Sequence, residues 1–559
     1  MTAADHHDRG ETGCPLTEPQ EGLWYAQALD PANPILNTGQ YLELTGPLDR
    51  NALARAVFLT VAESPALSLR FHDTPQGPRQ RTGLPPILGF VDLTAQPDAG
   101  SQAVAQMRAD SRRPLNLAAE PAAALSLIAL GPERHFLYER IHHLAIDGYG
   151  MVLVTNRIAA HYAALLGQGP VPEPFGPLAL AQDEDAAWRA SPRRAADRDW
   201  WHGQLADLPE VAGPAPGRAV SSHEFLRDSR QLHPSLLRNL ADYAARHRLG
   251  WPDVLNALCG AYLARWTGGE AVIGLPFMAR MGRKIAQLPC MAMNVLPHRL
   301  RPDEDAPLPE WLAAQSRDMA QARRRGLYRS ELLRRELGLV GGTRRLYGSL
   351  VNVQPFDKAP EFPGLACRLH IMGAGAVDDL TLTFRGDPTS GMLFQVDANP
   401  ALYTADEVRG HAERLPAFLS AALAAQTLAE VPTASPAEIA LFARRAAATR
   451  YPLPDTTLTA LIERQLAASP DAPAVREGDQ RLSFRDLDRR SAGLAAALGH
   501  RGAGPDGIVA VALPRGLELP VALLGILRAG AAYLPLDPDH PAERIARILS
   551  LSSPVAVLT

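Results

Sequence analysis

The sequence predicts an α/β fold, and three stretches of the chain support this prediction. Residues 41–71 contain a strand pattern, a segment of helical periodicity and a second strand pattern. An aromatic and branched run over residues 136–141 precedes a helical stripe of apolar residues over 151–166. A third strand-like run, over residues 271–280, passes into a Gly and Pro turn and a cation. Strands that alternate with helices in this way are typical of α/β lobes.

Charge, hydropathy and cysteine content exclude several classes of protein. A formal net charge of -4 and a pI near 6.5 argue against a nucleic-acid partner, because phosphate-binding surfaces are basic. The chain has no run of about 18 uninterrupted apolar residues; the nearest candidate, residues 521–534, is broken by Arg528. Four widely spaced cysteines without a Cys-x-x-Cys pair are typical of a reducing compartment. We therefore expect a cytoplasmic protein without a nucleic-acid or membrane partner.

The strongest candidates for chemistry are two adjacent histidines, His142 and His143, which lie between the strand predicted over 136–141 and a turn predicted at Asp147-Gly148. Successive strand side chains point to opposite faces, so only one of the two can enter a given cavity. For the same reason, and because no further ligand stands at a recognised spacing, we expect no metal site. Asp147 could orient an imidazole, but no Gly-x-Ser-x-Gly elbow supplies a serine nucleophile. Two interpretations stay open: structural histidines, or one histidine that handles a proton without a covalent intermediate.

The string His142-His143-x-x-x-Asp147-Gly148 resembles the signature of condensation domains of nonribosomal peptide synthetases, whose superfamily includes chloramphenicol acetyltransferase. Epimerization domains and other acyltransferases share this string, so the family's other motifs are needed to support the resemblance. Segments similar to these motifs follow in the family's order. The residues that match them are Gln20 and Trp24, then Gly274, Pro276 and Arg280, then Asn294, and then Asn352.

The resemblance implies two chloramphenicol acetyltransferase-like lobes in a V shape, with a tunnel through their junction. Two phosphopantetheine arms would enter from opposite ends, one on a donor peptidyl or aryl carrier protein and one on an acceptor peptidyl carrier protein. The acceptor's amine would attack the donor's thioester carbonyl and form an amide. The chain itself would bind no cofactor.

Within this tunnel we expect His143 to face the substrates and His142 to pack behind it. An α-amine with a pKa of about 8 is neutral in roughly a tenth of molecules at pH 7, so its activation contributes only about 1.4 kcal/mol. Holding amine and carbonyl in attack geometry can contribute on the order of 7 kcal/mol. We therefore favour positioning plus removal of a proton by His143 over pure base catalysis.

The resemblance also assigns supporting roles. Asp147 is expected to form a bidentate ion pair with Arg280 and so hold the turn, a geometry that lysine could not fully replace. Gly148 and Tyr149 would line the donor channel, where the missing side chain of glycine leaves room for a thioester arm. Further candidates for the tunnel wall are Asn294 and Asn352.

The domain boundaries follow from these motifs and from composition. We predict a disordered tail over 1–14, a first lobe over 15–185, a second lobe with a crossover over 186–430, and a linker over 431–455. Residues 456–559 resemble the start of an adenylation domain, through Arg481–Leu487 and Leu527–Pro538. That family's phosphate loop and catalytic lysine have no counterpart here, so we expect no adenylation activity, a fragment of a larger synthetase, and the rest of the adenylation domain as a partner.

The subtype depends on the residues after the signature. Tyr149-Gly150 departs from the common Trp-Ser and is similar to condensation domains of siderophore synthetases of the enterobactin type, which take an aryl or acyl-amino donor from a separate protein. One alternative is an epimerization domain, against which the adenylation-like segment downstream argues. The other is a catalytically idle module that docks carrier proteins or tailoring enzymes, against which the intact His143 argues.

Overall fold

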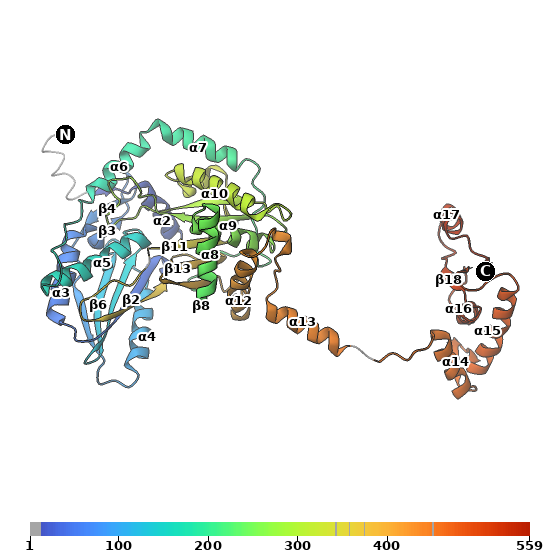
Figure 1. Ribbon diagram of the computed structural model, residues 1–559. Helices are drawn as coiled ribbons and strands as arrows, with labels where there is room; N and C mark the ends of the chain where they lie inside the picture. The colour runs from blue at the N-terminus through green and yellow to red at the C-terminus, as the bar shows by residue number, and fades with distance from the viewer. Residues whose placement is uncertain (1–12, 341–343, 357, 374, 450–451) are drawn as a thin grey trace. The chain divides into compact units, whose positions relative to one another are not determined.

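The structure is a computed structural model that describes residues 13–559, apart from residues 341–343, 357, 374 and 450–451 (Figure 1). The chain divides into two compact units, the first ending at Phe442 and the second running from Ala443 to Thr559. Both units combine helices with sheets, which confirms the predicted α/β class.

The first lobe is built on a five-stranded sheet with helices on both faces. In spatial order its strands are β12 (Ala366–Gly373), β2 (Asn37–Thr45), β7 (Arg134–His142), β6 (Ala123–Gly131) and β5 (Leu88–Asp92), and its helices are α3 (Arg50–Glu63), α4 (Ala99–Ser111) and α5 (Gly148–Leu165). Side chains of β7 alternate between two cores, as the pleat requires. Leu137 and Ile141 pack with α3 and α5, whereas Phe136 and Tyr138 pack with α4.

The strand β12 joins this sheet from far downstream in the chain. It belongs to the segment predicted as the second lobe, yet it pairs antiparallel with β2, for example Cys367 with Leu44. A boundary at residue 185 therefore does not separate the two lobes completely. Periodicity can indicate that a segment is a strand, but not which sheet it joins, so this crossing could not be predicted from the sequence.

A small sheet includes residues at the start of the described chain. Its strands are β1 (Cys14–Pro15), β4 (Arg79–Thr82) and β3 (Leu69–His72). Cys14, which we assigned to the disordered tail, instead pairs with Gln80. The rest of that predicted tail, residues 1–12, lies outside the described residues. The helix α2 (Glu18–Leu29) follows β1 in the chain and begins after Thr17.

The second lobe is built on a six-stranded sheet whose two faces differ. In spatial order its strands are β10 (Asn294–Leu300), β9 (Ala271–Phe277), β11 (Leu350–Gln354), β13 (Leu380–Asp387), β14 (Gly391–Ala398) and β8 (Leu226–Gln231). One face packs against α8 (Pro234–His247), α9 (Trp251–Ala264), α10 (Leu308–Arg324) and α12 (Ala405–Ala422). On β13, Leu382 and Phe384 are buried in that core. Thr383 and Arg385 point to the other face and line a cavity.

The predicted crossover between the lobes is largely helical. It contains α6 (Ala179–Arg189) and α7 (Pro192–Gln204), which run along one side of the unit in Figure 1. Ser191 caps α7 by accepting a hydrogen bond from the backbone of Arg193. The short helix α11 (Ser330–Glu336) completes this region and packs with α7.

The linker predicted over 431–455 contains a helix, α13 (Pro436–Ala448), that buries none of its side chains. Beyond it, the second unit holds α14 (Leu458–Ala468), the hairpin β15 (Pro473–Glu477) and β16 (Gln480–Ser483), α15 (Phe484–Gly499), β17 (Ile508–Val511), α16 (Glu518–Arg528), β18 (Ala532–Pro535), α17 (Ala542–Ser552) and β19 (Ala556–Leu558). Strands β18, β17 and β19 form a parallel sheet.

The apolar run over 521–534 divides between the helix α16 and the strand β18. None of the helices in the described part of the chain is long and apolar enough to cross a membrane. The cysteines Cys14, Cys259, Cys290 and Cys367 are all free.

Candidate active site

The two histidines stand where β7 ends and the chain turns toward α5. The backbone N–H of Ala145 donates to the carbonyl of His142 at 2.9 Å, which closes a turn that places His143 second. We predicted this turn at Asp147-Gly148, and that position was wrong. Asp147 instead caps α5, because its Oδ1 accepts a 2.8 Å hydrogen bond from the backbone of Gly150. Aspartate favours both turns and helix starts, so its presence alone does not distinguish them.

His142 packs behind the turn, and only 3% of its surface is exposed. Its Nδ1 accepts from the backbone N–H of Leu144 at 3.2 Å, so Nε2 is the protonated nitrogen and donates to Gln27 Oε1 at 3.2 Å. Burial lowers the pKa of His142 to about 3. The ring is therefore neutral and fully used by structural contacts.

His143 is partly buried, and its ring lines a cavity. Its backbone N–H donates to the carbonyl of Leu36 at 2.8 Å, which fixes the turn against the residue before β2. Across the cavity lies Gly375, where a Cβ would come within 3.6 Å of Cδ2 and 3.9 Å of Nε2 of the imidazole. Burial lowers the pKa of His143 below its ordinary value, against an opposing effect of Asp147. A neutral imidazole at pH 7 is able to accept a proton.

A buried ion pair of Asp147 and Arg280 joins the lobes beside this turn. Nη2 of Arg280 donates to both carboxylate oxygens, at 2.9 and 3.0 Å, and each side chain is 2% exposed. The carboxylate also accepts from the backbone N–H groups of Ala292 and Met293, both at 3.0 Å. With Gly150 included, every donor to this carboxylate is a fixed group, so the burial of its charge is compensated.

We predicted a bidentate ion pair of Arg280 with Asp147, and a single guanidinium nitrogen makes both contacts with the carboxylate. Only Nη2 reaches Asp147, while Nη1 donates to the carbonyls of Ile285 and Leu288 at 3.0 and 2.7 Å. Nη2 donates in addition to the carbonyl of Cys290. The guanidinium thus binds three carbonyls of the loop between β9 and β10 and holds this loop in place. The sequence pattern did not indicate this structural role.

A pair of glutamines supports the turn from the other side. Gln20 Nε2 donates to the carbonyl of Leu144 at 3.0 Å. Gln20 and Gln80 also exchange amide hydrogen bonds of 2.9 and 2.7 Å in both directions. Gln20 was singled out by resemblance alone, and this contact gives it a physical role. No feature of the sequence pointed to Gln80.

The cavity has a volume of about 370 Å³ and is lined by both lobes. The predicted residues His143, Asp147, Gly148, Tyr149, Asn294 and Asn352 all contribute to its wall. The amide of Asn294 is largely occupied, since it donates to the carbonyls of Gly326 and Tyr328. The ring of Tyr149 meets Phe356 edge-on at 5.1 Å. Across the described residues, no group of three metal-binding side chains occurs.

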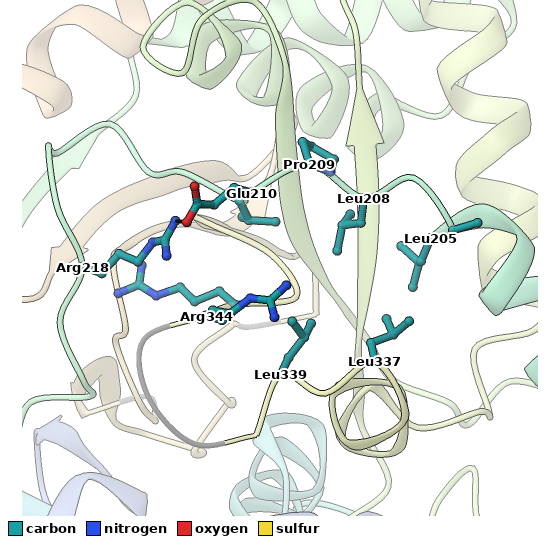
Figure 2. Close-up of a pocket in the computed structure, with 11 residues that line it drawn as sticks. Leu205, Leu208, Pro209, Glu210, Arg218, Leu337, Leu339 and Arg344 are labelled. Atoms are coloured by element: carbon teal, nitrogen blue, oxygen red, sulfur yellow. Dashed lines mark ion pairs between the residues drawn. The ribbon is translucent and has the colours of Figure 1, made fainter.

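A second, smaller cavity of about 180 Å³ lies in the second lobe. Figure 2 shows leucines, among them Leu205 and Leu339, on one side and the ion pair of Glu210 and Arg218 on the other. Its described lining contains no histidine, cysteine or hydroxyl group.

Comparison with known proteins agrees with this geometry. The family model described as Condensation domain matches residues 11–441, and that described as AMP-binding enzyme matches residues 462–559. The chain is 36% identical to a dimodular nonribosomal peptide synthase of Bacillus subtilis over 97% of its length, and 32% identical to enterobactin synthase component F of Escherichia coli O157:H7 over 98%. It covers only 23% and 43% of these relatives.

A solved relative is the starter condensation domain of rhizomide synthetase in complex with C8-CoA and Leu-SNAC. It is 33% identical, with a TM-score of 0.70 over 76% of this chain and 96% of that one. Fold and site thus define an acyltransferase of the chloramphenicol acetyltransferase-like class. The chain belongs to the condensation domain family of nonribosomal peptide synthetases, whose members form amide bonds, and it continues into the start of an adenylation domain.

The Arg280→Lys substitution is expected to lower the free energy of unfolding of the first unit by about 1–3 kcal/mol, because lysine keeps the charge but cannot reach Asp147 and the three carbonyls together. Tryptophan fluorescence during urea unfolding measures this, since all seven tryptophans precede Ala443. Arg409→Lys, in an exposed pair with Asp406, is the control and should change stability by less than about 0.5 kcal/mol. Equal effects of the two would contradict the structural role of Arg280.

His142 predicts a loss of stability in acid. Between its ordinary pKa of 6.5 and its folded value of about 3, the unfolded chain binds a proton that the folded chain does not. The titration of His142 therefore does not change the free energy of unfolding above pH 6.5. Below pH 6.5 it lowers this free energy, by at most about 1.4 kcal/mol per pH unit. His142→Asn keeps an acceptor for Leu144 but does not titrate there. Urea unfolding at pH 7.5 and 5.5 should show a smaller drop in this variant; identical drops would refute the assignment.

Proposed function

We propose that the chain forms an amide between an aminoacyl acceptor and an acyl or peptidyl donor, both held as thioesters on phosphopantetheine arms of carrier proteins. The acceptor nitrogen bonds to the donor carbonyl carbon, the carbon–sulfur bond breaks, and the donor arm leaves as a thiol. The observation that carries this proposal is the neutral imidazole of His143 in a cavity shared by two lobes.

His143 would bind the attacking amine and take the proton that it loses. A ring with a lowered pKa is unprotonated at neutral pH, so it can accept this proton without first losing its own. It is a weak base, however, and the amine is already partly neutral. Most of the rate enhancement then comes from placement of amine and carbonyl within reach of each other.

The donor is proposed to enter beside Gly148 and Tyr149 and to carry a starter group rather than a long peptide. The rhizomide relative is a starter condensation domain that holds an acyl-CoA, and enterobactin synthase component F is similar over almost the whole chain. Octanoyl and benzoyl thioesters therefore represent the acyl and the aryl alternatives, with leucyl thioester as the acceptor.

Intact-protein mass spectrometry of two loaded carrier proteins incubated with the chain tests this function. A mass gain of the acceptor carrier equal to the donor acyl group indicates amide formation. An unchanged mass with inverted stereochemistry of the released amino acid on a chiral column indicates epimerization. An unchanged mass and stereochemistry, with carrier binding in a separate assay, indicates a docking module. We expect the first result.

His143→Ala should reduce the rate of amide formation on the order of 100-fold or more, because both the hydrogen bond to the amine and the proton acceptor are lost. Single-turnover transfer between loaded carriers measures this rate. His223→Ala, at a half-exposed histidine paired with Asp30, is the control and should retain the unmodified rate. Unchanged transfer by a folded His143→Ala variant would exclude the proposed role.

Gly148→Trp should block donor entry, since a side chain at this position projects into the cavity. We expect kcat/KM for the donor to fall about tenfold to a hundredfold, the equivalent of 1–3 kcal/mol of steric strain, with the acceptor's KM retained. Gly203→Trp, on the exposed side of α7 with nothing within 4 Å, is the matched control. A larger effect on the acceptor than on the donor would reverse the assignment of the channel.

A further inference from the structure

Gln354 faces Gly148 across the cavity. Gln354 is the last residue of β11 and Gly148 the first of α5, so the two walls come from different lobes. A Cβ on Gly148 would lie 3.6 Å from Gln354 Nε2, and apart from its two chain neighbours and the backbone of α5 no other atom of the described residues comes within 4 Å of that point. The passage at Gly148 is therefore bordered by one polar atom, an amide nitrogen.

The direction of this amide is fixed by Arg385. The two residues are register partners on β11 and β13, and Arg385 Nη1 donates to Gln354 Oε1. Arginine has only donors, so the oxygen of the amide must face it, and the two N–H bonds of Nε2 point away. Arg385 is held in turn by Gln395, whose Oε1 accepts from Nε at 2.8 Å. A donor is thus oriented into the passage, and none of the described residues accepts from it.

We propose that Gln354 Nε2 donates a hydrogen bond to an amide carbonyl of the thioester arm as the arm passes Gly148. This positioning role rests on the proposed function. The pantetheine arm contains two secondary amides, and each of their carbonyls loses a water partner on entering the cavity. The same amides occur in an arm on a carrier protein and in coenzyme A, so either source presents the same chemistry.

His143 and Gln354 border different parts of the cavity wall. The glycine that borders His143 is Gly375, where a Cβ would meet ring atoms at 3.6 and 3.9 Å. At Gly148 the corresponding neighbourhood contains Gln354 and no atom of His143. The two glycines therefore border different parts of the cavity wall, and we assign the contact with Gln354 to the arm rather than to the reacting carbonyl.

The test compares Gln354→Glu and Gln354→Met with the unmodified chain. Glutamate retains an acceptor for Arg385 but removes the N–H donor, and methionine removes the donor without adding charge. Donors are a carrier-bound thioester, the CoA thioester and the amide-free ethanethiol ester of the same octanoyl or benzoyl group, whichever the unmodified chain transfers faster. The two arm-bearing donors should show a three- to tenfold rise in KM, roughly one lost hydrogen bond, with kcat retained. The ethanethiol ester should show no change.

Gln168→Glu is the matched control, because it introduces the same substitution at an exposed glutamine that neither lines the cavity nor contacts Arg385. It should leave the donor KM unchanged. An equal rise in KM for the ethanethiol ester, no rise for any donor, or the same rise in Gln168→Glu would overturn the role of Gln354. A rise with only one of the arm-bearing donors would assign the contact to that source of the arm. Failure of the unmodified chain to transfer any donor would instead contradict the proposed function itself.

Discussion

The carboxylate of Asp147 is the contact on which the site depends. It accepts from Gly150 at the start of α5 and from Arg280, Ala292 and Met293 of the second lobe. A buried carboxylate that lost one of these donors would carry an uncompensated charge, which is costly in a medium of low polarity. The same group thus sets where α5 begins and which part of the second lobe lies beside it. The turn that contains His143 lies just before Asp147 in the chain, so the contacts of Asp147 also fix the position of this turn.

The polar groups around the cavity suit the proposed reaction, which changes little net charge. In that reaction amine and thioester become amide and thiol, so no strong permanent charge has to be stabilised. Correspondingly, His143 is neutral, the charge of Asp147 is compensated, and Gln20 and Gln354 are amides held in one orientation by their partners. Such groups fix positions at small cost in desolvation, which agrees with our proposal that placement of the reactants is the main source of rate enhancement.

The sequence allowed prediction of features that are local in the chain. The strand before His142, the helix after Asp147 and the strand starting at Ala271 follow from periodicity, and the structure has all three. The partnership of Asp147 with Arg280, 133 residues apart, was accessible only through resemblance to a family. Local chemistry misplaced the turn, because aspartate and glycine favour helix starts as well as turns.

Other features depend on pairings that no local pattern encodes. Gln80 meets Gln20, and Arg385 meets Gln354, only because separate strands are neighbours in the folded sheets. The direction of an amide side chain depends in addition on which atom of it the partner can bond. The alternation of β11 and β13 indicates that one face of each is apolar, but it does not indicate that the opposite face borders a cavity.

The position of β12 in the sheet of the first lobe limits where this chain can be joined to parts of other synthetases. An exchange of the first lobe at residue 185 would leave β12 behind, so the incoming β2 would have to pair with a β12 from a different protein. Where the two strands do not match, the edge of β2 opposite β7 is left open, which favours aggregation. Hybrid synthetases that keep both lobes together and join within the exposed helix α13 avoid this exposure.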